Sequence, residues 1–310
     1  MIAYTYKRIN IMRNEQLNME PGQSFEKEKE LSVMKERIEQ SLNNIETREK
    51  VTKDFLHTFE QLGLSSDEAK KICNRVFELL LGGKPLLDIE QETLRVFENI
   101  KLDNGDKEQN LIEILHEKLI DRAKIIATQV SPYLKNTGDK VIDYGAGDGQ
   151  ITQILHDKLG LNIEGVDVRL YKASNITVPI KLFNGSHVDV ADKEYGSGLL
   201  TNVLHHEKEN EKILNELDRI VKNKLVVLET VPVGKTEEIM EQDKDRTFMN
   251  DYLYNRLFHS ADVPVPGTFE TPQKWIERFS QHGWQLDSEE DLGFDQPTIK
   301  DRHYLLVFKK

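Results

Sequence analysis

A glycine-rich turn after an apolar strand is the part of the sequence that most clearly predicts ligand chemistry. The segment KVIDYGAGDGQ (140–150) carries glycines at positions 145, 147 and 149, with Asp143 two residues before the first of them. Glycine lets the backbone adopt positive φ and pass close beneath a ligand. The free N–H groups at the start of the following helix then point toward that ligand. We therefore expect a binding site at the carboxyl end of this strand.

The spacing of these glycines discriminates between ligands. A dinucleotide fingerprint has the pattern G-x-G-x-x-G, whereas this turn has G-x-G-x-G with a carboxylate beside it. A pyrophosphate is disfavoured next to an anion, but an ammonium group is favoured there. S-adenosylmethionine (SAM) carries an ammonium group on its methionine part and has no phosphate. The pattern therefore favours SAM as the cofactor, and another nucleotide is the alternative.

An acidic residue follows the next apolar strand. Asp167 ends the segment Gly165-Val-Asp167, 18 residues after Gly149. A carboxylate at the tip of the neighbouring strand can accept hydrogen bonds from both ribose hydroxyls. The alternative interpretation is a solvated loop residue. The turn and Asp167, in this order and spacing, together predict SAM binding.

The elements that must position these residues alternate between strands and helices. A long amphipathic helix is expected at about 111–134, and short apolar segments follow it: KVIDYG, LNIEGVD, IKLFNG, GLLTNVL, KLVVLET and HYLLVFKK. Strands that alternate with helices predict an α/β protein with a doubly wound, mostly parallel sheet covered on both faces.

The first hundred residues have a different pattern. Residues 26–60 are rich in Glu and Lys with sparse apolar positions, which predicts an exposed helix, and helical spacing continues to about residue 100. The polar segment 101–110 is the best candidate for a boundary. The predicted division is a disordered segment at 1–25, a helical N-terminal domain or cap at 26–105, and a SAM-binding domain at 106–310 with a lid-like insertion at 231–269.

Composition narrows the functional classes. The net charge of −12 argues against a broad nucleic-acid groove, because an acidic surface repels phosphates. The single cysteine, Cys73, excludes a disulfide framework within one chain and is expected to be a buried apolar residue. No apolar run reaches the roughly 20 residues that span a bilayer, and the N-terminus lacks the apolar region of a signal peptide. A cytoplasmic protein without a membrane segment is expected.

At this point the motifs resemble a known family. VIDYGAGDG, GVDV and LLTNVLHHEKENEKILNELDRIVKNKLVVLE look like class I SAM-dependent methyltransferases, over about residues 111–310. The resemblance implies a seven-stranded sheet whose last two strands, Gln285–Asp291 and Tyr304–Lys309, form an antiparallel hairpin. It implies that Asp143, Gly145 and Gly147 border the methionine part and that Asp167 binds the ribose.

The resemblance also implies the remaining cofactor contacts. Asn184 and Gly185 would flank the adenine, and Asn202 would lie beneath the sulfonium with Thr201 and His205. The full set of expected cofactor-binding residues is Asp143, Gly145, Ala146, Gly147, Asp167, Val168, Asn184, Gly185 and Asn202.

Three residues are candidates for the chemistry of methyl transfer. His205 and His206 follow the predicted fourth strand directly, and Glu229 ends the fifth. Either histidine could act as a base, since histidine titrates near neutrality, or the pair could pack and cap a helix. Glu229 could orient or deprotonate an acceptor, or face water. No metal is expected, because adjacent histidines point in different directions and no third ligand is near in sequence.

The methyl acceptor is expected to be an oxygen or nitrogen of a small-molecule metabolite. The acidic charge, the insertion around Phe248–Phe258 and the segment NVLH, which stands where base methylation would require Asn-Pro-Pro-Tyr, favour this hypothesis. Asp295, Gln296 and His303, between the last two strands, are further candidates to line the site. The alternatives are a protein or RNA methyltransferase recruited through the helical N-terminus, and a non-catalytic SAM-binding module. The N-terminal helices could also form a homodimer.

Overall fold

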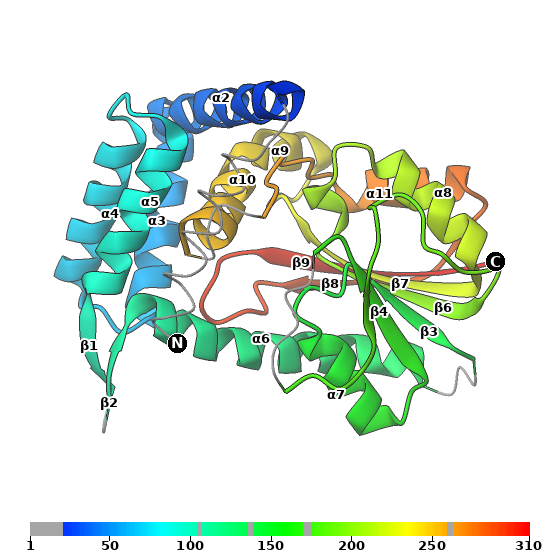
Figure 1. The fold of residues 1–310 in the computed structure, drawn as a ribbon. Coiled ribbons are helices and arrows are strands. Elements are labelled where there is room, and N and C mark those ends of the chain that lie inside the picture. Colours follow the sequence, from blue (N-terminus) through cyan, green and yellow to red (C-terminus); the bar gives the residue numbers. More distant parts are fainter. Residues whose placement is uncertain (1–20, 105–106, 136–138, 170–174, 259–262) are drawn as a thin grey trace.

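A seven-stranded sheet forms the centre of the C-terminal part of the chain (Figure 1). The computed structural model describes residues 21–104, 107–135, 139–169, 175–258 and 263–310. The strands occur in the order β5-β4-β3-β6-β7-β9-β8. Their bounds are β3 Val141–Tyr144, β4 Ile163–Asp167, β5 Ile180–Leu182, β6 Tyr195–Thr201, β7 Val221–Val231, β8 Gln285–Gly293 and β9 Arg302–Lys309.

The pairing of the strands confirms the predicted fold class. Strands β5, β4, β3, β6 and β7 pair in parallel, whereas β9 runs antiparallel to β7, with Lys224 opposite Lys309. Strand β8 completes an antiparallel hairpin with β9. The order of the strands reverses at β3, which places the glycine turn at the topological switch point, where ligands bind in such sheets.

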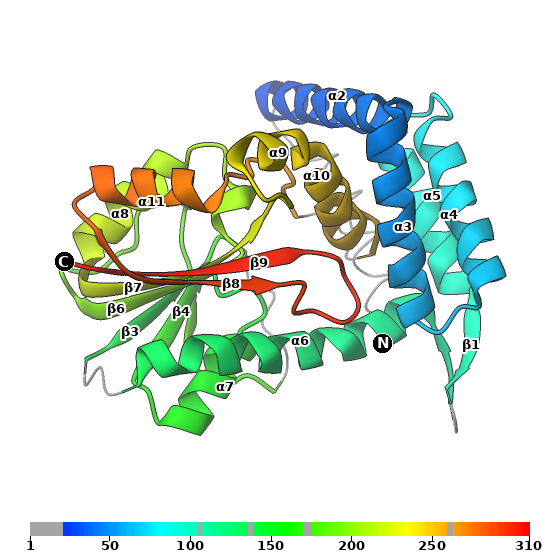
Figure 2. The ribbon, with the colours of Figure 1, turned by 180° about the vertical axis from the view of Figure 1, so that it is seen from behind.

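Helices cover both faces of the sheet (Figures 1 and 2). On one face lie α6 (Leu111–Leu134) and α7 (Gln150–Leu159), and on the other lie α8 (Asn210–Ile220) and α11 (Pro272–Gln281). Each face has its own apolar core. Ile126, Val130 and Leu155 pack in one, and Leu217 and Trp275 pack in the other. Both faces of the central strands are therefore apolar, as the continuous apolar segments predict.

In its described residues, the N-terminal region contains four helices and a short hairpin. The helices are α2 (Pro21–Asn43), α3 (Ile45–Gln61), α4 (Ser66–Leu80) and α5 (Leu86–Asn99). The polar segment predicted as a break forms β1 (Lys101–Asn104) and β2 (Lys107–Asn110), which pair antiparallel. The N-cap of α4 is Ser65, which forms a capping box with Glu68. Of the segment predicted to be disordered, residues 1–20 lie outside the described residues.

The prediction of a single exposed helix over residues 26–60 is wrong. The segment is divided at Asn44, which caps α3 through a hydrogen bond from the N–H of Thr47. Ile38, Leu42 and Val51 are fully buried, although charged residues surround them in the sequence. An apolar residue every four positions is enough to form a narrow stripe, and this stripe packs against other helices.

The insertion after β7 packs on these N-terminal helices. It contains α9 (Glu237–Gln242), α10 (Lys244–Tyr252) and the π-helix η2 (Leu253–Phe258), and residues 259–262 are not described. The apolar residues of α10 and η2 belong to the same core as α2–α5, and Figure 2 shows α10 between that bundle and the sheet. The segment thus links the bundle to the edge of the sheet where the strands end.

Two buried ion pairs hold α10 and η2 in place. Arg246 contacts Asp54 of α3 at 2.6 Å, and Arg256 contacts Glu90 of α5 at 2.9 Å. Both pairs are bidentate, with two hydrogen bonds to each carboxylate. Bidentate pairs fix the orientation of both partners as well as stabilising the contact. They therefore hold α10 and η2 in one position over the edge of the sheet.

Two expectations from composition can be compared with the structure. Among the described residues, no helix combines the length and the apolar character needed to cross a bilayer. Cys73 is buried in the helical bundle, and burial raises the pKa of its thiol to about 12. This confirms that Cys73 is a buried apolar residue.

Candidate active site

The glycine turn leaves β3 with a backbone that requires its glycines. Gly145, Gly147 and Gly149 have φ of 79°, 57° and 83°. A Cβ on Gly145 would lie 2.5 Å from Cγ2 of Val203, so the close approach of the two loops excludes a side chain. A Cβ on Gly147 would meet no described atom within 4 Å. The surface above Gly147 is therefore open to a ligand, while Gly145 closes the turn against the end of β6.

Asp143 lies buried behind this turn with half of its carboxylate unused. Oδ2 accepts a hydrogen bond from the hydroxyl of Thr152 at 2.6 Å, whereas Oδ1 has no partner among the described residues. Burial raises the pKa of Asp143 to about 7, and the charges of Asp167 and Asp148 act in the same direction. The hydrogen bond from Thr152 lowers this pKa but is outweighed. A buried acceptor without a partner requires explanation. A cationic group bound in the turn provides one, and the ammonium group of SAM fits it.

Asp167 connects the tip of β4 to the same turn. Oδ2 accepts the N–H of Gly147 at 2.8 Å, and Oδ1 accepts the N–H of Arg169 at 3.0 Å. The N–H of Val168 also favours the ionised carboxylate. At least one lone pair of the two adjacent oxygens remains free to accept from a ribose hydroxyl. The structure thus brings Asp167 and the turn together as the sequence predicts.

The residues expected around the adenine form an apolar edge beside Asp167. Val168 is 49% exposed, which is unusual for an apolar residue next to a buried strand. Gly185, with φ of 86°, approaches it so closely that a Cβ would lie 3.3 Å from Cγ1 of Val168. Asn184 instead uses its Oδ1 to accept the N–H groups of Ser186 and His187. Val168 and Gly185 are thus open to a flat ring, whereas Asn184 shapes the turn.

The first residue after β6 has a strained backbone. Asn202 has φ of 56°, in the left-handed region that side chains rarely adopt. Its Oδ1 accepts a hydrogen bond from the hydroxyl of Thr230 at 3.2 Å, and its Nδ2 is buried without a partner in the described part of the chain. Strained residues with unused polar groups concentrate at functional sites. Ala146, by contrast, uses its N–H on Val166 at 3.0 Å within the turn.

Glu229 holds the loop that carries the two histidines. One carboxylate oxygen accepts the N–H groups of Val203 and Leu204, each at 2.8 Å. The other contacts Nδ1 of His205 at 2.6 Å, and the residue is only 1% exposed. Glu229 therefore does not face water. Its contacts favour a role in positioning η1 (Leu204–His206) over direct contact with an acceptor.

His205 is held between two carboxylates. Its ring stacks on Phe269 with centroids 4.9 Å apart, and Nε2 lies 3.7 Å from Oδ1 of Asp251 on α10. Burial disfavours a charged imidazole, but Glu229 and Asp251 outweigh that effect and raise the pKa of His205 to about 10. Without a metal, His205 is thus protonated at neutral pH, and a free general base at this position is not favoured.

The two histidines approach a common third group, contrary to the expectation that they point apart and have no third ligand nearby. The rings of His205 and His206 lie 4.1 Å apart and both approach Asp251, with Nε2 of His206 3.9 Å from Oδ1. Potential ligand atoms of the three residues all lie within 4.8 Å of one another. The third group comes from the insertion, 45 positions after His206, where proximity in sequence gives no indication of it. Asp251 stands in the mostly apolar stretch FMNDYLY (248–254), and a carboxylate there is the signal that could have shown it.

A second polar group lies between the last two strands. Nδ1 of His303 contacts Asp295 at 2.7 Å, and the other oxygen of Asp295 accepts from Gln129 at 2.6 Å. Nε2 of His303 and Oδ1 of Asp301 are buried without a partner among the described residues. Burial raises the pKa of Asp301 to about 6, and it interacts electrostatically with His303, Asp251 and His205. The sequence predicted His303 and Asp295 as lining residues but missed Asp301.

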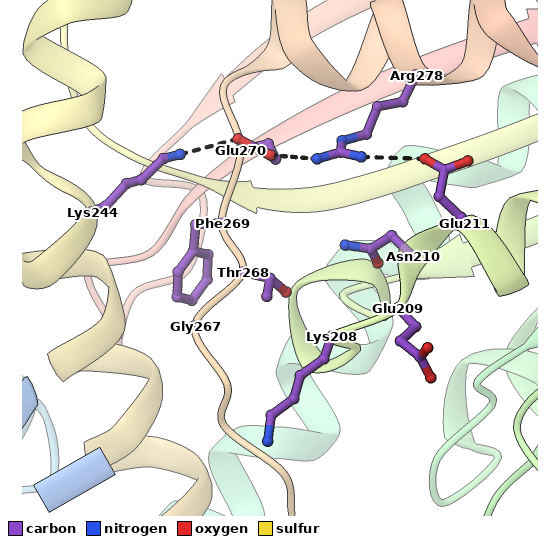
Figure 3. Close-up of a pocket in the computed structure, with 10 residues that line it drawn as sticks. All are labelled: Lys208, Glu209, Asn210, Glu211, Lys244, Gly267, Thr268, Phe269, Glu270 and Arg278. Carbon is purple, nitrogen blue, oxygen red and sulfur yellow. Dashed lines mark hydrogen bonds and ion pairs between the residues drawn. The ribbon is translucent and has the colours of Figure 1, made fainter. Parts of the chain in front are cut away.

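A separate surface hollow of about 280 Å³ is lined by residues 208–211, which follow the histidine loop, and by residues 267–270 (Figure 3). Figure 3 shows a row of ion pairs across it: Glu270 contacts Lys244 at 3.0 Å and Arg278 at 2.8 Å, and Arg278 also contacts Glu211. The other two charged lining residues, Lys208 and Glu209, pair with Glu30 and Lys212 outside the hollow. None of its lining residues belongs to the glycine turn. Its charges are already compensated, so we do not regard it as the acceptor site.

Comparison with known proteins identifies the domain. Residues 142–227 match the family model described as "Methyltransferase domain". The match covers the glycine turn, Asp167 and the histidine loop. No curated protein matches the sequence.

Several solved structures resemble the fold at low identity. A methyltransferase in complex with the Haloferax volcanii Trm112 methyltransferase activator is 15% identical, with a TM-score of 0.45, 62% of this chain and 92% of that chain covered. Geranyl diphosphate C-methyltransferase from Streptomyces coelicolor is 11% identical, with a TM-score of 0.45 and coverages of 71% and 97%. The Burkholderia thailandensis 1,6-didemethyltoxoflavin-N1-methyltransferase is 11% identical, with a TM-score of 0.43 and coverages of 62% and 77%. Structural similarity at this level concerns the fold and does not indicate the methyl acceptor.

The family match, the strand order and the glycine turn agree. The chain carries a SAM-dependent methyltransferase domain with the class I fold, and SAM is the cofactor of that domain. The unused Oδ1 of Asp143 and the open surface above Gly147 suit this cofactor. The individual cofactor contacts assigned from the sequence remain predictions.

One such contact predicts how cofactor affinity depends on pH. The pKa of Asp143 is about 7 without cofactor. Below that pH the carboxyl is protonated, and an incoming ammonium group must displace the proton. Affinity for the product S-adenosylhomocysteine, which keeps this ammonium group, should therefore fall on acidification, at most about tenfold per pH unit. Above the pKa the affinity should level off. Calorimetric titrations between about pH 5.5 and pH 8 measure this.

The matched control for this prediction is Asp143→Asn, which keeps an acceptor for Thr152 but cannot ionise. Its affinity should be low and independent of pH across the same interval. An unmodified chain whose affinity stays constant or rises on acidification would show that Asp143 does not contact the ammonium group.

Proposed function

We propose that the chain transfers a methyl group from SAM to an oxygen or nitrogen of a small-molecule metabolite. SAM supplies a methyl group already activated by its positively charged sulfur. The protein must then align an acceptor atom with that methyl group. The observation that carries the proposal is a group of buried polar atoms without partners where the strands end.

These atoms come from the end of β6, the start of β9 and the insertion. The side chains of Asn202, Asp251, Asp301 and His303 each have a buried N or O atom without a hydrogen-bond partner in the part of the chain described. The hydroxyl of Thr230, which donates to Asn202, lies on the residue opposite His303 in the pairing of β7 and β9. Leaving such an atom unpaired costs about 1–3 kcal/mol. A polar acceptor molecule would satisfy these donors and acceptors, which supports a hydroxyl- or amine-bearing substrate.

The covering of this region supports a small acceptor. Asp251 and His205 are buried, and α10 is tied to the helical bundle through Arg246 and Arg256. A macromolecule would need to reach past α10 to approach the methyl group. We therefore propose that residues 231–269 wall the acceptor site and that residues 26–105 form a helical cap over that wall.

The proposal is tested by offering the purified chain radiolabelled SAM with three classes of acceptor. These are a library of hydroxyl- and amine-bearing metabolites, total RNA, and a protein extract. We expect label in at least one metabolite and none in the two macromolecular fractions. Label confined to RNA or protein would contradict the proposal. Release of S-adenosylhomocysteine with no acceptor would reveal hydrolysis instead.

Two further parts of the proposal concern association and location. We also propose that two copies pair through the N-terminal helices, on which Val33 of α2 and Ile45 of α3 are 60% and 77% exposed. Sedimentation of Val33→Lys beside the unmodified chain tests this, and an unmodified chain that stays monomeric would contradict it. The cytoplasmic location stays a prediction that a fluorescent fusion can test.

A further inference from the structure

His205, His206 and Asp251 converge from two separate elements. The histidines lie in η1 after β6, and Asp251 lies on α10. Oδ1 of Asp251 is 3.7 Å from Nε2 of His205 and 3.9 Å from Nε2 of His206. Both separations are too long for a hydrogen bond. The three groups therefore surround a common point without bonding directly to one another.

The outer nitrogen of each imidazole is already committed. Nδ1 of His206 lies 2.7 Å from the carbonyl oxygen of Pro264, and Nδ1 of His205 lies 2.6 Å from Glu229. A carbonyl oxygen and a carboxylate can only accept, so each Nδ1 carries a proton. In the neutral ring Nε2 then presents a lone pair. Histidines that bind metals are oriented in this way by a carbonyl or carboxylate on the other nitrogen.

Further hydrogen bonds hold the residues that carry these ligand atoms. Glu229 holds His205 and also accepts two backbone N–H groups of the same loop. The N–H of Thr268 and its hydroxyl both donate to the carbonyl oxygen of His205, at 3.4 and 3.0 Å. Asn255 donates to Oδ1 of Asp251 at 2.6 Å. Each of the three potential ligands is thus held in place by a hydrogen bond to a neighbouring group.

The spacing suits a bound divalent ion. Metal–ligand bonds of about 2.0–2.2 Å place neighbouring ligand atoms about 2.8–3.1 Å apart in an octahedral site and about 3.3–3.6 Å apart in a tetrahedral site. The two separations from Asp251, 3.7 and 3.9 Å, are longer than these values, and all three potential ligand atoms lie within 4.8 Å of one another, so the ligands must close further around an ion. In addition, Oδ2 of Asp251 is buried without a partner among the described residues. An ion bound through both oxygens of this carboxylate would give Oδ2 its missing interaction.

We propose that Nε2 of His205, Nε2 of His206 and the carboxylate of Asp251 bind a divalent first-row transition metal ion. Two imidazoles and one carboxylate form the ligand set of several zinc and non-haem iron sites, which leave other coordination positions open. Here those positions would be available to water or to an oxygen or nitrogen of the methyl acceptor. The proposal concerns ion binding itself, so it stands or falls separately from the identity of the acceptor.

The test is a direct measurement of ion binding to the full chain. Protein treated with EDTA and then desalted is titrated with Zn²⁺, Mn²⁺ and Co²⁺ by calorimetry, without SAM. We expect one saturable site per chain for at least one of these ions, and a rise in the thermal unfolding midpoint with that ion. If the site takes Co²⁺, visible absorption bands should appear that are typical of nitrogen and oxygen ligands.

Two variants remove single ligands. His206→Asn places an amide near Nδ1, so the hydrogen bond to Pro264 can persist while Nε2 is lost. Asp251→Asn keeps the size of the side chain but removes its charge. Each should weaken binding at least 100-fold. Because His206 is partly exposed, its variant is expected to fold even if Asp251→Asn does not.

The control is His282→Asn. His282 also pairs with a carboxylate, Glu211, at 2.9 Å, but lies outside the cluster. This variant should bind the ion like the unmodified chain. Binding that all three variants retain equally would identify an adventitious surface site and overturn the proposal. Absence of saturable binding by the unmodified chain would overturn it as well.

Discussion

Glu229→Gln is expected to lower the free energy of unfolding by about 3–5 kcal/mol, the usual cost of breaking a buried ion pair. Glu229 accepts hydrogen bonds from Val203, Leu204 and His205, and it is nearly inaccessible to water. A glutamine has one carbonyl oxygen, so its amide group must face either the two backbone N–H groups or the imidazole. One set of donors then loses its acceptor. Urea unfolding followed by circular dichroism measures the change.

The control for this variant is Glu289→Gln on β8. Glu289 is exposed and accepts a hydrogen bond from Tyr304, so its replacement should change the free energy of unfolding by less than about 0.5 kcal/mol. If Glu229→Gln were no more destabilising than this control, the carboxylate would not hold the histidine loop. Below its unfolding temperature the variant should still bind SAM, because Asp143 and Asp167 lie on other strands.

Asp167→Ala is expected to weaken SAM binding by about ten- to 150-fold. The value corresponds to about 1.5–3 kcal/mol for a hydrogen-bonded contact with a charged group. Alanine removes the proposed acceptor of the ribose hydroxyls, and it also removes the acceptor for the N–H of Gly147. Both effects weaken binding in the same direction. Calorimetric titration with S-adenosylhomocysteine measures the loss, and it avoids any turnover of the cofactor.

Two comparisons separate these effects. Asp167→Asn keeps one oxygen for the Gly147 N–H, so its affinity should lie between those of the alanine variant and the unmodified chain. Asp157→Ala on α7, an exposed residue that contacts Gln153, should leave affinity unchanged. An alanine variant at Asp167 with unmodified affinity would show that the ribose lies elsewhere.

The cofactor half of the site could be predicted from sequence because it is local. Gly145, Gly147 and Asp143 lie in one continuous segment, and Asp167 ends the next strand. Parallel strands in a doubly wound sheet end at the same edge, so the alternation of strands and helices along the sequence is enough to place these residues together. The antiparallel hairpin of β8 and β9 followed from the family resemblance, since the polar pattern of β8 does not define a buried strand.

The acceptor half could not be predicted in this way. Asp251 reaches His205 only because α10 is held by Asp54, which lies nearly 200 positions earlier in the chain. Contacts of that range depend on how the bundle packs on the sheet, and no periodicity encodes them. The unpaired atom of Asp301 likewise becomes apparent only once burial is known. The burial of α2 was missed because its apolar stripe is narrow and its surroundings are charged.

The most direct test of the central claim is a crystal structure of the chain with S-adenosylhomocysteine. We expect one molecule bound over Gly147, with both ribose hydroxyls on Asp167, the ammonium group toward Asp143 and the sulfur toward Asn202 and the histidine loop. Density for the ligand at another place on the sheet, or no binding at saturating concentration, would contradict the assignment of this edge as the site of methyl transfer.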